Sequence, residues 1–492
     1  MYFQLLTVGA SVRKLDHRTV VDGVDKVQLP LDDLEGWRAR VRSQGETAVQ
    51  NGARGRARRA TASHNVFISV ADAPASTDDL GPLAGVPFAV KDNIYTETLS
   101  TTAGSAAFAG WCAGVDAPAV GALRRAGARL VGKTNLHELA LGVTSDNATF
   151  GAVRNPSDPR RSASGSSGSS GGSAAAVALG VVPFALGTDT GGSMTIPASA
   201  CGVVGYRPSS GRYSKQGVIH LSSTRDEVGV MATSVADVRT IDRLIRGVDA
   251  GAEEDPPETL RLGVPSRYHE NLDAETGRAI TVALERLRAG GVELCSVVIG
   301  DIVDDAHEHG FSIVGFEAPR LLKNFMEGDA AALDLDLPRL VGATRSADVR
   351  ALLAGLLEHP VAPEAYERAV RARTRLRAQL AGVLAVEGVD ALLYPTMPTL
   401  PPMIGEHVVG GPGGDLPVFP TLTRHTEAGS FLGSPSVSIP VAEDSCPAVG
   451  LTLEGAPGGD DGLLSVASRV ARLVGSASIH QPARTRSIHD TV

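Results

Sequence analysis

The feature that most constrains the fold is a series of short apolar, β-branched runs that alternate with helical stretches from about Leu31 onward. This alternation is typical of an α/β domain. Because the runs are apolar throughout instead of alternating with polar residues, they indicate strands buried on both faces. The predicted strands are Gly85–Val90, Ala128–Val131, Val182–Leu186, Leu260–Val264, Val292–Ile299, Ala391–Tyr394, Ser436–Pro440 and Val449–Leu453.

Two helices are predicted with particular clarity. Ser173–Gly180 consists of small residues, which allow close packing against a sheet. From Tyr366 to Leu384, apolar residues recur at three- and four-residue steps, the pattern of an amphipathic helix. A row of arginines lies between them, and a solvated helix face is favoured over a binding face. The row is Arg371, Arg373, Arg375 and Arg377.

Length and composition indicate how many domains the chain forms and which classes of partner it can bind. A chain of 492 residues with 43% hydrophobic residues can bury a sizeable core. We expect one large domain over 31–476, with an N-terminal extension over 1–30 and a polar C-terminal tail over 477–492. With a net charge of −9 and 4% aromatic residues, neither nucleic acid nor a membrane is expected as a partner. The sequence leaves open whether the protein forms a homodimer.

Cysteine usage and the N-terminus bear on the compartment. The 4 cysteines are scattered, without a CxxC pair or other metal-ligand spacing. This pattern favours a reducing compartment and predicts neither a disulfide framework nor a metal site. The first residues lack the basic stretch of a signal peptide and the length of a membrane span. We therefore expect a cytoplasmic protein.

The most unusual segment is Gly165–Ser173, which contains only glycine and serine. Such a run can be a flexible linker. Here, however, an alanine-rich helix and an apolar strand follow at once. A Gly/Ser loop that ends at a helix N-terminus concentrates N–H groups and hydroxyls around one point. The context therefore favours a functional loop.

Two further segments carry chemistry. In Gly187–Pro197, the pair Gly191-Gly192 stands directly before Ser193. Two glycines allow a sharp turn that brings consecutive N–H groups toward an oxyanion. In Val86–Asn93, Lys91 ends an apolar run. A lysine there is commonly a surface residue, but when buried it loses its charge and becomes a base near neutral pH.

Together, these segments resemble the amidase signature family. The matching text includes GPLAGVPFAVKDNI, GKTNLHELALGVTSDNATFGAVRNPSDP, GSSGGSAAAVALGVVPFALGTDTGGS, STRDEVGVMATSVADV and VDALLYPTMP. The resemblance runs from about Leu31 to Val474. It implies an α/β fold in which helices cover both faces of a central mixed β-sheet.

The resemblance also implies a catalytic triad without histidine. Lys91 matches the family's lysine, Ser193 its nucleophile, and Ser169 its bridging serine in a cis peptide bond. The motif GSSG occurs twice, so Ser166 is an alternative to Ser169. Only the second copy precedes the alanine-rich helix, which favours Ser169. No cofactor or metal is implied.

Further roles follow from the residues themselves and, for the acyl pocket, from the resemblance. The N–H groups of Thr190, Gly191, Gly192 and Ser193 would hold the oxyanion. Ala140 and Gly142 would belong to the acyl pocket. Asp189 would orient the turn that carries Ser193, although a plain structural aspartate is equally expected. His137 and His425 are expected to be structural or to line the pocket. Two features depart from the family: the extra Gly/Ser residues, and Thr195 where many relatives have arginine.

The expected activity is hydrolysis of a small carboxamide to an acid and ammonia or an amine through a Ser193 acyl-enzyme. Within the family, the motifs resemble bacterial indoleacetamide and mandelamide hydrolases, which points to an arylacetamide-like substrate. Three alternatives remain open. They are an amide-forming acyltransferase, an amidotransferase subunit that supplies ammonia for tRNA-dependent amide formation, and a catalytically silent scaffold.

Overall fold

The computed structural model describes residues 31–72, 81–142, 144–163, 169–248, 259–411, 414–441 and 448–475. The predicted extension over 1–30 and the tail over 477–492 lie outside these residues, so both stay predictions.

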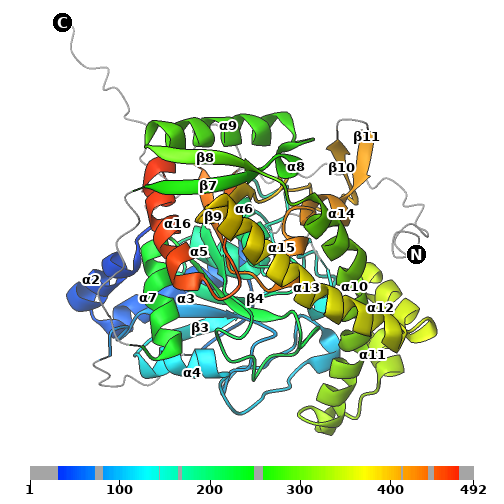
Figure 1. The fold of residues 1–492 in the computed structure, drawn as a ribbon. Coiled ribbons are helices and arrows are strands. Elements are labelled where there is room, and N and C mark those ends of the chain that lie inside the picture. Colours follow the sequence, from blue (N-terminus) through cyan, green and yellow to red (C-terminus); the bar gives the residue numbers. More distant parts are fainter. Residues whose placement is uncertain are drawn as a thin grey trace, which may run out of the picture.

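An 11-stranded mixed sheet forms the centre of the molecule (Figure 1). In spatial order its strands are β1 (Phe67–Val70), β3 (Arg129–Thr134), β2 (Pro87–Lys91), β4 (Phe184–Asp189), β6 (Glu227–Ala232), β5 (Val204–Arg207), β12 (Ser436–Val441), β13 (Val449–Glu454), β9 (Ala391–Pro395), β7 (Leu260–Pro265) and β8 (Val292–Val297). Strand β2 runs parallel to β3 and β4, whereas β4 and β6 are antiparallel. A separate hairpin joins β10 (Val408–Gly411) to β11 (Gly414–Pro417).

Helices surround the sheet (Figure 1). They are α2 (Leu34–Gln44), α3 (Glu46–His64), α4 (Pro118–Arg125), α5 (Gly171–Ala178), α6 (Thr195–Cys201), α7 (Val235–Arg246), α8 (Ser266–His269), α9 (Ala274–Ala289), α10 (Gly300–Glu327), α11 (Leu337–Ala343), α12 (Ala347–Glu358), α13 (Pro363–Glu387), α14 (Val418–Thr423), α15 (Glu427–Leu432) and α16 (Asp460–Val474). Short 3₁₀ helices are η1 (Ala106–Phe108), η2 (Glu138–Ala140) and η3 (Ala331–Leu333).

Alternate residues of β2 enter two different hydrophobic cores. Phe88 and Val90 join a core with side chains of α4, α7, α9 and α16, whereas Ala89 joins a second core with α3 and α5. Phe88 also stacks on Phe184 of β4, with ring centroids 5.6 Å apart. Period-two alternation thus packs helices on both faces of the sheet. The predicted fold, a mixed sheet covered on both sides, is confirmed.

Each predicted strand is present, but several extend into polar residues. Strand β2 continues to Lys91 and β4 continues to Asp189. Strands β1, β5 and β6 and the small hairpin were not predicted. Strand β6 contains Gly229, where a Cβ would lie 2.5 Å from the carbonyl oxygen of Tyr206. Its glycine allows close strand contact but interrupts the apolar pattern that identifies a strand.

The small-residue helix is confirmed as α5. A Cβ at Gly172 would lie 2.4 Å from the carbonyl oxygen of Asn135, so the first turn of α5 touches the loop after β3 directly. The glycines and alanines are therefore needed for close packing, and they bring the N-terminus of α5 to the ends of β2 and β3.

The amphipathic helix is confirmed as α13, but the prediction of a solvated arginine row is wrong for two of its members. Arg371 and Arg375 are exposed and pair with Glu367 and Asp305. Arg373 instead donates to the carbonyl of Phe431 at 2.6 Å, and Arg377 to that of Leu432 at 2.7 Å. Both guanidinium groups thus bind carbonyls at the end of α15, where positive charge is favourable.

Candidate active site

Lys91 ends β2, and its side chain is 0% exposed. Its Nζ donates to Oγ of Ser169 at 2.7 Å and to Oγ1 of Thr188 at 2.8 Å. Thr188 lies near the end of the neighbouring strand β4, and its hydroxyl also accepts a hydrogen bond from Asn93 at 3.1 Å. The parallel pairing of β2 and β4 therefore fixes the lysine amine next to Ser169.

Burial lowers the pKa of Lys91 to about 7, against the opposing effect of the Asp189 and Asp226 charges. Desolvation disfavours the ammonium form, and a group that titrates near neutral pH can both take and return a proton there. Lys91 thus has the protonation properties of a general base.

Ser169 connects Lys91 to Ser193. It stands before Ser170, the residue that caps α5. Its Oγ lies 3.2 Å from Oγ of Ser193, and its N–H lies 3.3 Å from the same atom. The bond between Ser169 and residue 168 lies outside the described residues, as does Ser166. The cis peptide and the exclusion of the alternative serine therefore stay predictions.

Ser193 follows β4 in a tight turn that only glycine can form. Gly192 has φ of +119°, and a Cβ there would lie 2.3 Å from Oγ1 of Thr426. The Thr426 hydroxyl donates to the carbonyl of Gly191 at 2.9 Å. The turn expected from the Gly-Gly pair is therefore present, and the segment before α15 holds it from outside.

Asp189 holds the same turn from inside. Its Oδ1 accepts from the N–H of Gly192 at 3.0 Å and from the hydroxyl of Ser430 at 2.8 Å, and its Oδ2 accepts from the N–H of Met194 at 2.7 Å. The carboxylate thus brackets Ser193 with two backbone bonds. The expected orienting role of Asp189 agrees with this geometry.

These bonds also bear on the expected oxyanion donors. The N–H of Gly192 is already engaged by Asp189. Of the four expected donors, Gly192 thus shapes the turn, and Thr190, Gly191 and Ser193 remain expected donors. Thr190 is fixed by its hydroxyl, which donates to Asp226 at 2.7 Å.

An arginine reaches this turn although Thr195 replaces the one that many relatives carry. Arg207 of β5 is buried, and its Nη1 lies 3.7 Å from Oδ1 of Asp189. Thr195 itself donates to the carbonyl of Gly192 at 3.4 Å. Positive charge near Asp189 therefore comes from β5 and not from position 195 at the start of α6.

A second buried lysine lies close to Lys91 in the fold but outside its contacts. The Nζ of Lys133 donates to the carbonyl of Ile94 and to Oγ1 of Thr101, both at 2.7 Å, and lies 3.6 Å from Asp92. Burial lowers the pKa of Lys133 to about 8, against the charge of Asp92. Asp92 therefore pairs with Lys133 and not with Lys91.

Ala140 and Gly142 lie in the segment after β3. Ala140 ends the short helix η2 with φ of +56°, and a Cβ at Gly142 would lie 2.0 Å from Nε2 of His137. The chain is thus strained at Ala140 and packed against a ring at Gly142. Their part in an acyl pocket stays a prediction.

The two singled-out histidines are held by other groups. The Nε2 of His137 lies 3.0 Å from the carboxylate of Asp348, and Nδ1 of His425 lies 2.7 Å from the carbonyl of Pro395. Burial pulls the pKa of His425 well below its ordinary value. A neutral, backbone-bound His425 fits a structural role.

Sequence reasoning missed several residues that hold the site. They are Thr188, Arg207, Thr426 and Ser430. Thr188 could have been found as a polar residue that follows the predicted strand Val182–Leu186 and stands directly before Asp189. The other three gave no signal, because neither a single arginine in the segment after α6 nor single hydroxyls far along the chain follow a pattern.

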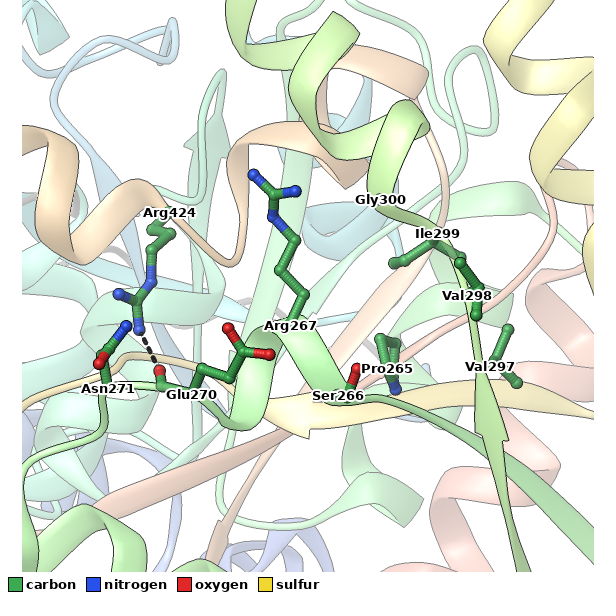
Figure 2. Close-up of a pocket in the computed structure, with 10 residues that line it drawn as sticks. All are labelled: Pro265, Ser266, Arg267, Glu270, Asn271, Val297, Val298, Ile299, Gly300 and Arg424. Atoms are coloured by element: carbon green, nitrogen blue, oxygen red, sulfur yellow. Dashed lines mark hydrogen bonds between the residues drawn. The ribbon is translucent and has the colours of Figure 1, made fainter.

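A cavity of about 400 Å³ lies outside the triad. Figure 2 shows its lining, with Arg424 bonded to the carbonyl of Glu270 at 2.9 Å and the apolar Val297 and Ile299 on the opposite side. None of Lys91, Ser169 and Ser193 lines it. This cavity is therefore separate from the candidate catalytic centre.

The described residues contain neither a membrane-spanning helix nor a cluster of metal-binding side chains. No helix among them has the length and apolar character needed to cross a membrane. Nor do three or more histidine, cysteine or acidic side chains gather there as a metal site would require.

Comparisons with known proteins identify the family. The family model described as Amidase matches residues 60–464. The chain is 34% identical to indoleacetamide hydrolase of Pseudomonas savastanoi over 80% of this chain and 84% of that protein. It is 32% identical to mandelamide hydrolase of Pseudomonas putida over 82% of this chain and 81% of that protein.

Among solved structures, a crystal structure of an amidase superposes with a TM-score of 0.78 and 34% identity, covering 90% of this chain and 99% of that one. The matched family model, the two relatives and this structure lead to one assignment. The chain belongs to the amidase signature family and is an enzyme that acts on amide bonds.

Proposed function

We propose that this enzyme hydrolyses a small carboxamide to a carboxylic acid and ammonia or an amine through an acyl-enzyme on Ser193. The observation that carries the proposal is the continuous contact chain from Lys91 Nζ through Ser169 Oγ to Ser193 Oγ, with steps of 2.7 and 3.2 Å. A serine hydroxyl is a weak nucleophile until a base removes its proton. The contacts through Ser169 connect Ser193 to Lys91, which would serve as this base.

Acylation proceeds by proton relay. Neutral Lys91 takes the proton of Ser169, which takes the proton of Ser193 while the Ser193 oxygen attacks the amide carbon. The turn of Thr190, Gly191 and Ser193 supplies N–H donors to the tetrahedral oxyanion. One such donor contributes about 2.7–4 kcal/mol to lowering the barrier.

Collapse of the tetrahedral intermediate reverses the relay. Ser169 gives its proton to the leaving nitrogen and regains one from protonated Lys91, so the carbon–nitrogen bond breaks with release of neutral ammonia or amine. Water then attacks the acyl-enzyme with the same groups as base. The relay needs no histidine, in keeping with the engagement of His137 and His425 elsewhere.

We propose an arylacetamide-like substrate class. The support is the similarity to relatives named indoleacetamide hydrolase and mandelamide hydrolase, whose names describe a primary amide on a carbon that bears an aromatic group. In this chain the acyl group would lie near Ala140 and Gly142.

The test is a panel assay with the purified full chain. Phenylacetamide, mandelamide, indole-3-acetamide, propionamide and glutamine are supplied, and released ammonia is measured with Ser193→Ala as the control. We expect hydrolysis of the aryl compounds. Preferred turnover of glutamine would favour the amidotransferase alternative. Amide products in place of acid after addition of an amine would favour the acyltransferase.

A further inference from the structure

A buried ion pair lies over the turn that precedes Ser193. Arg225 is 2% exposed, and its Nη1 lies 2.8 Å from Oε1 of Glu427 and 2.9 Å from the carbonyl of Gly310. Its guanidinium carbon lies 5.8 Å from the ring centroid of Phe431. The arginine thus sits between the start of α15 and the middle of α10.

Two glycines show how closely this pair approaches its surroundings. A Cβ on Gly191 would lie 3.1 Å from Oε2 of Glu427 and 4.0 Å from Nη2 of Arg225. A Cβ on Gly310 of α10 would lie 2.1 Å from Oε1 of Glu427. The turn and the helix both lack a side chain where the pair is seated, so the pair directly covers Gly191.

The carboxylate of Glu427 lies close enough to the Ser193 turn to repel negative charge there, and Arg225 offsets this repulsion. Glu427 is only 18% exposed and stands beside a turn where negative charge develops in the transition state. At such distances an unpaired carboxylate opposes an oxyanion, and the repulsion is stronger in a site of low dielectric than in water. A guanidinium in contact with that carboxylate offsets its charge and so reduces this repulsion.

We propose that Arg225 is a positioning residue for the amidase reaction: it neutralises Glu427 over Gly191 and so supports the negative charge of the tetrahedral intermediate. The inference rests on the proposed Ser193 chemistry. A role confined to folding would lower stability in both single variants without selectively lowering kcat or boronate affinity. The electrostatic role makes the two residues unequal, because loss of Arg225 leaves a bare carboxylate whereas loss of Glu427 leaves a cation.

The experiment compares Arg225→Met, Glu427→Gln and the double variant in kcat and KM for phenylacetamide and in inhibition by phenylboronic acid. Boronic acids form a tetrahedral anion on a serine oxygen and therefore report oxyanion support. We expect Arg225→Met to lower kcat and weaken boronate inhibition at least 100-fold with little change in KM. Glu427→Gln should cost less than 10-fold, and the double variant should regain most of the loss.

A matched control is Arg212→Met, which breaks another buried pair, with Asp242, where Nη2 lies 2.7 Å from Oδ2. It should lower Tm and leave boronate affinity unchanged. If Arg225→Met does not fold, Arg225→Lys and the double variant carry the test, and both should exceed 10% of wild-type kcat. Equal losses in Arg225→Met and Glu427→Gln, or a double variant no better than Arg225→Met, would overturn the inference.

The two proposals fail differently. Reaction of wild-type Ser193 with a fluorophosphonate and hydrolysis of phenylacetamide establish the reaction independently of Arg225. If wild-type protein shows neither, the proposed function fails and this inference with it. If wild-type protein shows both, only the pattern among the variants decides the role of Arg225.

Discussion

The amine of Lys91 lies 2.7 Å from the hydroxyl of Ser169, and both side chains are buried. A buried amine that titrates near pH 7 can serve as a base only through a partner that it touches. The contact with Ser169 therefore matters for catalysis, and the burial of Lys91 matters for stability.

Ser193→Ala should abolish turnover and fluorophosphonate labelling while the circular dichroism spectrum stays unchanged. The hydroxyl is the proposed attacking group, and its removal leaves the hydrogen bonds of Asp189 to Gly192 and Met194 in place. Undiminished ammonia release by a pure preparation would rule out the acyl-enzyme.

Ser169→Ala should slow acylation by about 10²–10⁴-fold, the usual contribution of a proton-transfer group. Single-turnover measurement with a chromogenic anilide reports this step. Ser166→Ala is the matched control, since it alters the other copy of GSSG, and it should retain the wild-type rate. The reverse result would assign the bridging role to Ser166.

Lys91→Met should remove the rise of kcat/KM with pH that wild-type enzyme shows around an apparent pKa of about 7. Neutral lysine is the active form, so the wild-type rate increases as pH rises through that value. Methionine keeps the apolar stem but accepts no proton. Lys133→Met is the control, because Lys133 also has a depressed pKa, of about 8, yet bonds to Ile94 and Thr101. It should keep the same apparent pKa, whereas a shifted profile would point to Lys133 as the base.

Lys91→Met should also stabilise the fold more at pH 6 than at pH 9. The folded pKa is about 7 and the unfolded value about 10.4. Between these values the unfolded chain binds the additional proton, so wild-type stability rises with pH across this window and is lowest below pH 7. Methionine carries no such penalty. In urea unfolding, the gain in free energy of unfolding caused by Lys91→Met should be larger at pH 6 than at pH 9 by an amount on the order of 2 kcal/mol. The control is Lys323→Met, whose side chain is 58% exposed and which should show no such difference.

Asp189→Asn should lower kcat by about 10²-fold, since an amide cannot accept all the hydrogen bonds that fix Ser193 and a small displacement of a nucleophile has an effect of this size. Substitution of Ser430 by alanine removes only one of those bonds and should cost less. Steady-state kinetics of both variants checks the order of the two effects.

The sequence predicts the central part of this site well and its supports poorly. Lys91 ends β2 and Ser193 follows β4 in a turn, and both strands come from predicted apolar runs. The predicted strands stop short of Lys91 and Asp189, the polar residues at which β2 and β4 end. A polar residue ends the strand that an apolar pattern predicts, although the backbone of that residue still pairs with the neighbouring strand. The catalytic ends of strands are therefore where pattern reasoning is least complete.

The supports escape prediction for a different reason. Arg225 and Glu427 meet only because β6 and α15 are brought together, and a charged residue in a sequence is usually solvated. The same expectation failed for Arg373 and Arg377, which bind carbonyls of α15. A charged residue is buried only where a partner is available, and local sequence patterns do not predict that partner.

The hydrogen bonds from Thr426 and Ser430 to the turn before Ser193 have a consequence for synthesis of the chain. Lys91, Ser169 and Ser193 all emerge from the ribosome long before Thr426 and Ser430, which follow Gly191 and Asp189 by 235 and 241 positions. Helix α15 is too short to persist alone and is tied to α13. A nascent or truncated chain that ends before α13 therefore contains every proposed catalytic group but lacks the contacts that hold the Ser193 turn from the α15 side, so we expect the growing polypeptide to stay inactive until α15 has been made.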